Sequence, residues 1–300
     1  MLRRSRHILK SFWSAFQSKR SGFSFALIAW WSFHIAILSG VILSFHYRPW
    51  GDVFTTVSRL TGLLPYGSYL RTLHYLSGQC FLIFTLAHAL ECFWNDRYRT
   101  TPSKAWPRLV FLVFVAFGLT LTGFILKGDK EGIFAARIMY HLIQEIPLIG
   151  FGLANIFLRP GEDIFLLPFL HHVIILPFIV LLLLSQHRRS LFPKGDLLWP
   201  LLAGISLLAL IYPMPPDIPP HMDMATPTGP WFFLGTQLLL RYIPPFWAGI
   251  ALPLLPLALM AALPLIPSAY ASLMRKATAA SWGAHGMLLL LAWWLIPRFG

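Results

Sequence analysis

The sequence predicts an all-α membrane protein, a polytopic transmembrane helical bundle of about seven spans. Hydrophobic residues make up 57% of its 300 residues and charged residues only 12%, about half the charged share of a soluble domain. The mean hydropathy is +0.65. Apolar stretches long enough to cross a bilayer recur along the chain, and short segments between them hold most of the charge. These three observations exclude a soluble domain.

The seven apolar stretches divide into two groups. Four belong to a predicted core at residues 23–190, and three belong to a predicted C-terminal part at residues 191–300. Their lengths and hydropathy predict spans at about 23–46, 70–94, 107–127, 165–187, 196–213, 246–266 and 281–297.

Residues 1–22 form a basic segment that carries six Lys and Arg residues. The apolar stretch after it is long and lacks a small-residue cleavage site, so we interpret the segment as an uncleaved cytoplasmic surface segment on anionic lipid. If the N-terminus lies in the cytoplasm, nine more Lys and Arg residues fall in loops on that side. The cytoplasmic side then holds 15 of the 24 Lys and Arg residues. Because cytoplasmic loops are rich in basic residues, this distribution predicts a cytoplasmic N-terminus. The net charge of +13 therefore reflects membrane orientation and does not indicate nucleic-acid binding.

Two segments on the opposite side are too long to be simple connections. Residues 128–164 contain the stretch from Glu131 to Ile143, whose mixed pattern predicts a helix along the membrane interface. Residues 214–245 are rich in proline, which disfavours a spanning helix but suits a segment that lines a pocket.

Two of the predicted spans each carry two histidines at similar spacing. His74 and His88 are 14 residues apart, which is about 21 Å along a helix and a rotation of about 40°. His172 and His187 are 15 residues apart, about 22 Å and 60°. Since both spans run in the same direction, the imidazoles fall at two matching depths. Opposed pairs of this kind suit two metal ions, and haem with two histidine ligands is the obvious candidate.

Two alternatives concern these histidines. A single imidazole inside a bundle can be satisfied by a carbonyl, so packing is the alternative for each one taken alone. His171 competes with His172, but it lies about 160° around the helix from His187, which favours His172 as the ligand.

These residues resemble the cytochrome b subunit of quinol-oxidising bc-type and bf-type complexes, over most of the chain. The spacing of 15 and the seven spans resemble the bf-type version, with its two separate parts fused here. The resemblance rests on the four histidines and on Arg71 before His74, Ser39-Gly40, His46-Tyr47, Thr122-Gly123-Phe124, Glu145-Ile146-Pro147-Leu148-Ile149-Gly150, and His172 followed by Pro177.

The resemblance implies two non-covalent b-type haems in a four-helix core. His74 and His172 would ligate one near the outer surface, and His88 and His187 would ligate the other near the cytoplasmic side.

The resemblance also implies roles for residues around the outer haem. Gly40 and Gly123 would give that haem room, since glycine allows close approach, and Arg71 would pair with a propionate. Trp231 and Phe232 would line a quinone pocket, with core packing as the alternative.

The chain departs from the family at four places. Ala26 and Leu109 stand where glycines are expected beside the cytoplasmic haem, and Glu91 stands where the family has a propionate-binding arginine. After the third span, the family's Trp-Asp-Gln or Trp-Gly-Gln stretch is replaced by Lys127-Gly128-Asp129-Lys130. The Pro-Glu-Trp-Tyr motif of the quinol-oxidation site becomes Gly229-Pro230-Trp231-Phe232, so its proton-accepting glutamate is missing.

Other titratable groups on the outer side are candidates for that lost function. They are Glu145, His221 and Asp223, for which an ordinary solvated loop position is the alternative. A proton acceptor must reach the quinol oxygen, and sequence spacing does not place these residues there.

We therefore predict a membrane dihaem cytochrome that transfers electrons between a quinone and an outer-side redox partner, as a subunit of a quinol:cytochrome c oxidoreductase-like complex. The resemblance implies a Rieske-type iron–sulfur subunit or a c-type cytochrome as partner, a homodimeric complex, and a prokaryotic cytoplasmic membrane. One alternative is a haem-bearing anchor that relays electrons between a dehydrogenase and quinone without bifurcation. A haem-free transport or structural membrane protein is the other.

Overall fold

The computed structural model of the chain describes residues 24–100, 104–159, 161, 164–185, 197–222 and 227–296. Within these ranges every regular element is a helix, which confirms the predicted all-α fold. The predicted surface segment at 1–22 lies outside the described residues, and so do His187 and Asp223.

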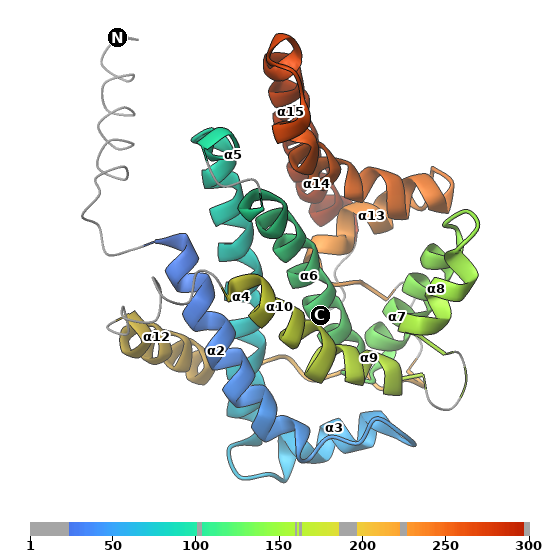
Figure 1. Cartoon of the computed structure of the whole chain (residues 1–300). Coiled ribbons are helices and arrows are strands. Elements are labelled where there is room, and N and C mark those ends of the chain that lie inside the picture. Colours follow the sequence, from blue (N-terminus) through green and yellow to red (C-terminus); the bar gives the residue numbers. More distant parts are fainter. Residues whose placement is uncertain are drawn as a thin grey trace.

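Four helical segments lie side by side and form the main bundle (Figure 1). Helix α2 packs along α4, α4 packs against α6, and α6 packs against α10. These segments confirm that the first four predicted spans are helical. Their bounds are Phe25–Ser44 for α2, Gly67–Trp94 for α4, Ala105–Ile125 for α6, and Leu166–Leu184 for a rod made of α9 (Leu166–Leu170), η1 (His171–Ile175) and α10 (Leu176–Leu184).

The interior of this bundle is closely packed by side chains from all four segments. Phe33 of α2, Leu82 of α4, Ala116 of α6 and Val180 of α10 belong to one buried cluster. Leu82, Ala116 and Val180 have no exposed surface. Because lipid tails are as apolar as leucine, such close packing rather than removal from water holds membrane helices together.

Short helices lie at both ends of the bundle. One end, here called the α3 end, carries α3 (Val53–Gly62), α7 (Lys130–Gln144) and α8 (Gly150–Phe157). The opposite α5 end carries α5 (Arg97–Thr100) (Figure 1). Helix α7 confirms the helix predicted between Glu131 and Ile143. Its N-cap is Asp129, whose side chain accepts a hydrogen bond from the Gly132 N–H at 2.8 Å.

The C-terminal part adds three longer helical segments and a partly helical proline-rich segment. Helix α12 (Leu198–Ile211) packs against α2 and α4. The remaining elements are η3 (Trp231–Phe233), α13 (Leu234–Leu239), a rod Phe246–Leu265 made of η4 (Phe246–Ala251), α14 (Leu252–Ala262) and η5 (Leu263–Leu265), and α15 (Ser268–Leu295). The predicted proline-rich loop therefore contains a helical turn and a short helix.

Five helices in the described ranges are long and apolar enough to cross a membrane, namely the four of the bundle and the rod Phe246–Leu265. The predicted fifth span is the shorter α12, of 14 residues. The predicted seventh span is only the second half of α15, which begins at Ser268 and not near residue 281. The predicted span started too late because the first half of α15 contains charged residues, which lower its hydropathy. One of them, Arg275, pairs with Asp96 at 3.3 Å and keeps that half at the α5 end.

The two parts of the chain are joined by buried polar contacts. The indole N–H of Trp106 on α6 donates to the carbonyl oxygen of Met260 on α14 at 2.7 Å. Trp106 is 2% exposed and Met260 is fully buried, so this bond lies in the interior. A buried hydrogen bond across two helices fixes their relative register.

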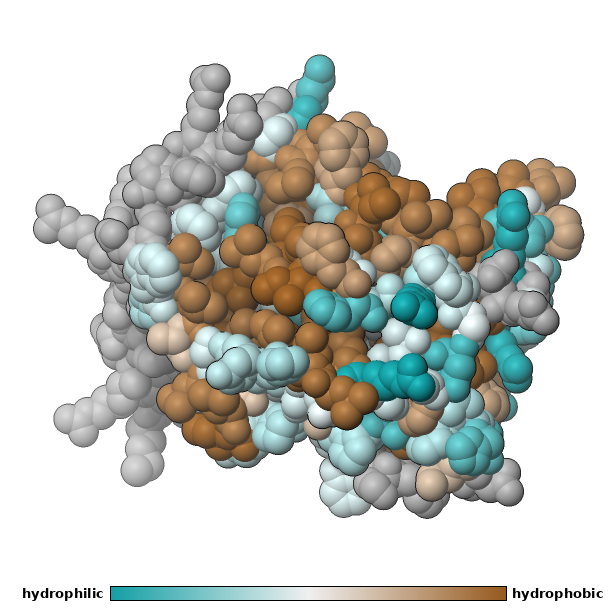
Figure 2. All heavy atoms as spheres, turned by 90° about the horizontal axis from the view of Figure 1, so that it is seen from below, coloured by the Kyte–Doolittle hydropathy of each residue, from teal (hydrophilic) through white to brown (hydrophobic). Residues whose placement is uncertain are grey.

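The outer surface remains apolar over large areas. Figure 2, seen from the α3 end, shows hydrophobic side chains over much of the face and hydrophilic ones gathered within it. Leu38, Phe178, Leu207 and Leu290 are each more than half exposed, from four different helices. Soluble monomers rarely expose apolar surface on this scale, so these side chains are those expected to face lipid.

Candidate functional site

The rod Leu166–Leu184 contains a π-helical turn, η1, which carries His172. In η1 the N–H of Leu176 donates to the carbonyl oxygen of His171, five residues earlier. A π turn holds one residue more than an α turn, and proline lacks the N–H that an α turn would use. Pro177 follows at once, in the first turn of α10. The rod Leu166–Leu184 therefore contains one additional residue in the turn that carries His172.

The structure brings His74 and His172 together at the α3 end. Their ring centroids are 5.9 Å apart and the ring planes are inclined by 78°. His74 Nδ1 lies 2.9 Å from the carbonyl oxygen of Ala36 on α2. His172 Nδ1 lies 3.0 Å from the carbonyl oxygen of Leu119 on α6. A carbonyl only accepts, so each Nδ1 carries the proton and donates it, which leaves Nε2 with a free lone pair.

The same backbone pattern surrounds both imidazoles. Ser39 Oγ lies 3.3 Å from His74 Nδ1, and Thr122 Oγ1 lies 3.2 Å from His172 Nδ1. Each hydroxyl donates to the carbonyl four residues earlier in its own helix, Ile35 for Ser39 and Gly118 for Thr122. The two imidazoles therefore have the same set of local contacts.

A glycine follows each of these hydroxyl residues and faces the imidazole. A Cβ atom on Gly40 would lie 2.8 Å from His74 Cε1, and one on Gly123 would lie 2.7 Å from His172 Cε1. Real Cβ atoms do not approach other heavy atoms so closely. The resemblance assigns these glycines to making room for a haem. In the structure, each glycine leaves room for the neighbouring imidazole side chain.

The separation of the two rings would suit one metal centre held between the two imidazoles. Metal–nitrogen bonds of about 2.0 Å put the centres of two such rings roughly 6 Å apart. The observed separation of 5.9 Å agrees with this value. His171 lies elsewhere, with Nδ1 2.8 Å from the carbonyl oxygen of Leu167 and its ring 4.9 Å from that of Phe157. The structure therefore pairs His172, and not His171, with His74.

His88 lines a cavity of about 200 Å³ at the other level of the bundle, towards the α5 end. Its Nδ1 lies 3.3 Å from a carboxylate oxygen of Glu91, one turn further along α4. The expected partner His187 is outside the described residues. Ala26 and Leu109, which replace the expected glycines, both line this cavity.

Two polar side-chain atoms in the wall of the cavity have no hydrogen-bond partner among the described residues. They are the buried Trp30 Nε1 and Thr85 Oγ1 atoms. Arg97 and Arg108 also line the cavity. Orphan polar atoms and the cation of Arg108 in a mostly apolar cavity suit an anionic, largely apolar ligand such as a tetrapyrrole with carboxylate substituents.

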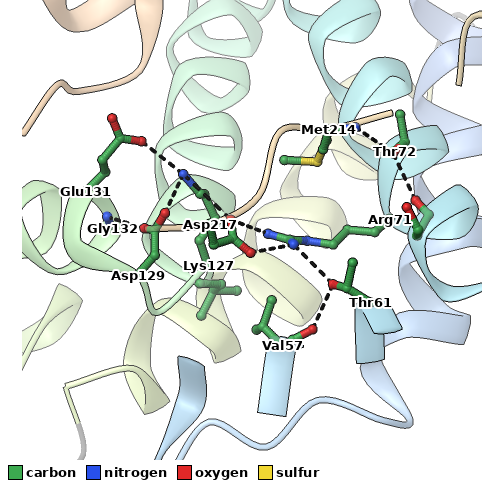
Figure 3. A network of polar contacts seen from close by, with 12 residues as sticks. Val57, Thr61, Arg71, Thr72, Lys127, Asp129, Glu131, Gly132, Met214 and Asp217 are labelled. Carbon is green, nitrogen blue, oxygen red and sulfur yellow. Dashed lines mark hydrogen bonds and ion pairs between the residues drawn. The ribbon is translucent and has the colours of Figure 1, made fainter. Parts of the chain in front are cut away.

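Arg71 is paired within the protein. Its guanidinium donates to both carboxylate oxygens of Asp217, at 2.5 Å and 2.8 Å, and also to Thr61 Oγ1 at 3.1 Å (Figure 3). Asp217 belongs to the proline-rich segment, and no sequence pattern predicted its pairing with Arg71. It is the one acidic residue between α12 and residue 222, in a run of prolines, which is the only local signal of its role.

Among the remaining predicted residues, Trp231 and Phe232 contact each other, with ring centroids 5.7 Å apart. Trp231 Nε1 donates to Gln79 Oε1 on α4 at 2.7 Å, and the Phe232 ring lies 5.4 Å from that of Phe117 on α6. Both pack against the buried cluster of the main bundle. Glu145, at the C-cap of α7, and His221, in the proline-rich segment, are exposed.

Comparison with known proteins gives consistent matches. A family model described as cytochrome b/b6/petB matches residues 14–193. Cytochrome b6 of Heliobacterium modesticaldum is 28% identical over 168 residues, which are 54% of this chain and 78% of that protein. The menaquinol:cytochrome c reductase cytochrome b subunit of Geobacillus thermodenitrificans is 25% identical over 166 residues, 54% of this chain and 74% of that protein.

A solved structure extends the similarity to the C-terminal part. A chain of a hyperthermophilic respiratory complex III matches with a TM-score of 0.73 over 94% of this chain and 86% of its own length. Because the sequence identity is 20%, this match establishes the fold only.

Proposed function

Because the chain belongs to the cytochrome b family, as the match over residues 14–193 shows, we propose that it carries two b haems and passes electrons between a quinol and an outer-side redox partner. The family and the named relatives identify it as a multi-pass membrane b-type cytochrome of quinol-oxidising electron-transfer complexes. Beyond the family, we propose the number of haems, the residues that ligate them, the redox partner and the orientation in the membrane.

Four histidines would hold the two haems. His74 and His172 would bind one at the α3 end, and His88 and His187 would bind the other towards the α5 end. Each haem, when bound, supplies a centre that accepts and gives one electron. Nδ1 of His74 and Nδ1 of His172 each donate a hydrogen bond to a backbone carbonyl oxygen, which orients the ring and strengthens Nε2 as a donor atom.

Other residues would bind the substrate and the haem substituents. Trp231 and Phe232, fixed against α4 and α6, would form one wall of the quinone site. Arg71 would contact a propionate only in competition with Asp217, since its guanidinium already has that partner.

The partner of the proposed subunit is a Rieske-type iron–sulfur protein or a c-type cytochrome. A relative named as a menaquinol:cytochrome c reductase subunit supports this proposal. The complex would be homodimeric and would lie in a prokaryotic cytoplasmic membrane with the N-terminus in the cytoplasm. The excess of Lys and Arg on that side supports the orientation.

One observation carries the proposal, namely the duplicated arrangement around His74 and His172. The test is haem quantitation and a reduced-minus-oxidised spectrum of the purified protein and of His88→Ala, His172→Ala and His171→Ala variants. We expect two b haems per chain, one lost in each of the first two variants, and none lost in His171→Ala, the matched neighbour. A wild-type protein without b-haem absorbance from haem-replete cells contradicts the proposal.

A second function is favoured by the stretch Gly229-Pro230-Trp231-Phe232, which has no carboxylate. In this alternative, the protein relays electrons between a dehydrogenase and quinone and has no bifurcating site. Inhibitors of the outer quinol pocket distinguish the two functions. They block quinol-dependent haem reduction in the first and leave it unchanged in the second.

A further inference from the structure

A buried cluster of charged side chains lies at the α3 end, beside the segment that replaces the quinol-site motif. Lys127 Nζ lies 2.8 Å from Asp129 Oδ2, 3.1 Å from Glu131 Oε2 and 4.0 Å from Asp217 Oδ1 (Figure 3). Asp217 in turn holds Arg71 in a bidentate pair. The side chains are between 0% and 17% exposed, so water screens these charges poorly.

The cluster carries more negative than positive charge. Two cations, Arg71 and Lys127, face three carboxylates, those of Asp129, Glu131 and Asp217, which leaves one formal negative charge in excess. An uncompensated buried charge is costly, and binding a proton is the direct way to remove it. The groups are in contact, so the proton belongs to the cluster as a whole.

The pKa values of two members agree with this charge balance. Burial raises the pKa of Asp129 above its usual value and outweighs the attraction of Lys127. For Lys127, burial lowers the pKa, but the carboxylates around it outweigh burial and raise it. Lys127 therefore stays charged, and an added proton goes to a carboxylate. Tyr75 on α4 is a further titratable group that interacts with Lys127.

Thr228 connects the cluster to the motif segment. Its hydroxyl donates to Glu131 Oε1 at 2.6 Å. The next residue, Gly229, donates its N–H to Gln237 Oε1 at 2.9 Å, and Gln237 Nε2 donates to the Pro227 carbonyl oxygen at 2.9 Å. The segment is therefore held in place next to Trp231. A hydroxyl group both donates and accepts, so Thr228 can pass a proton on while it receives another.

We propose that Thr228 and Glu131 relay a proton from the quinol into this cluster, in place of the missing glutamate of the quinol-site motif. The inference rests on the proposed quinol oxidation. The quinol hydroxyl gives its proton to Thr228 Oγ1 as the Thr228 hydroxyl proton moves to Glu131 Oε1. The second quinol proton goes to water. For the oxidation to balance, two one-electron acceptors would take the quinol's two electrons and leave quinone, namely the haem that His74 and His172 would hold and the iron–sulfur or c-type centre of the partner.

The first test measures the cluster itself and does not depend on quinol. Infrared difference titration of the purified haem-containing protein follows the band of protonated carboxyl groups as the pH falls from mildly alkaline to mildly acid. We expect the cluster in wild type to take up one proton above the ordinary carboxyl range of about pH 4. Glu131→Gln abolishes this uptake, because two cations then face two carboxylates. The control Asp52→Asn, which removes an exposed carboxylate at the same end, keeps the proton uptake. Unchanged uptake in Glu131→Gln, or none in wild type, overturns the inference.

The second test measures the relay. The rate at which a short-chain quinol reduces the haem in the purified complex is compared for wild type, Thr228→Val and Thr228→Ser. Loss of a positioned proton acceptor lowers such rates about 100-fold, so we expect this loss in Thr228→Val with KM unchanged, and recovery in Thr228→Ser. Full haem content in each variant excludes a folding defect.

The outcomes separate the relay from the function on which it rests. A wild-type rate in Thr228→Val rejects the relay and leaves quinol oxidation intact. A wild-type protein that binds haem but that no quinol reduces rejects the proposed quinol oxidation, and the relay with it, while the infrared titration still decides whether the cluster accepts a proton.

Discussion

The two histidine levels of the bundle are built in different ways. At the α3 end, His74 and His172 bond to backbone carbonyls at 2.9 Å and 3.0 Å, and a glycine faces each ring. Towards the α5 end, His88 bonds to the side chain of Glu91 at 3.3 Å, and Ala26 and Leu109 line the cavity beside it. Backbone partners are fixed once the helices have packed, whereas a side-chain partner can rotate away. The first site is therefore the more rigid of the two, and the second is the one that substitution can tune.

The largest expected effect breaks the rigid site. In Gly123→Ala the new Cβ would meet His172 Cε1 at 2.7 Å, so the imidazole must leave its position. We expect the haem at the α3 end to be lost while the other is retained, which haem quantitation measures. Gly118→Ala on the same helix is the matched control, because its Cβ would make only an ordinary contact of 3.7 Å with Leu176. Two haems in Gly123→Ala contradict the structural account of this glycine.

The next effect concerns the ion pair that holds the proline-rich segment to the rigid site. Asp217→Asn leaves Arg71 without its carboxylate in a place where the side chains are 12% and 6% exposed. Removing one partner of a buried pair costs about 3 kcal/mol or more. We expect a lower Tm for the purified protein. The control is Asp96→Asn, whose pair with Arg275 is about 40% exposed and contributes at most about 1 kcal/mol. Equal Tm changes in the two variants argue against a buried pair.

A smaller effect tests whether the second site can be tuned. In Glu91→Gln the bond to His88 can persist, but the negative charge beside the ligand is removed. A less negative surrounding favours reduced iron, so the midpoint potential of one haem should rise on the order of tens of millivolts. Redox titration followed by optical absorbance measures this change, and the haem at the α3 end serves as the internal reference. If both potentials shift equally, Glu91 does not act through His88.

The smallest effect concerns the cap of α3. Asp52 accepts hydrogen bonds from the hydroxyl and N–H of Thr55, which lower its pKa. A lowered pKa stabilises the fold above the unfolded value of about 4, and this contribution is lost as the pH falls through the folded value. Asp52→Ala should therefore cost about 1 kcal/mol near neutral pH and less in acid, as thermal unfolding at both pH values would show. A cost that does not change with pH rules out the charged cap.

Local patterns predicted much of the bundle and of the rigid site. Apolar stretches indicated the four spans, and helical rotation favoured His172 over His171. The resemblance singled out Gly40 and Gly123, and the structure places them against the imidazoles of His74 and His172. These features depend on residues within a few turns of each other, where periodicity is informative.

Contacts between distant segments escaped prediction. Arg71 and Asp217 are separated by 146 positions, and nothing near Asp217 specifies a partner on α4. The resemblance assigned Arg71 to a propionate because that assignment follows from position alone. The π turn also remained hidden, although Pro177 was visible, because that proline alone is compatible with a regular helix.

The bond from Trp106 to Met260 has a consequence for how the molecule can be assembled. It joins α6 to α14 from opposite sides of residues 186–196, and Arg71–Asp217 joins the same two parts at the other end. A chain cut between residues 186 and 196 and co-expressed as two polypeptides should therefore recombine without the covalent link. The two fragments would hold each other at both membrane surfaces, so the gene could be divided there without loss of the assembled protein.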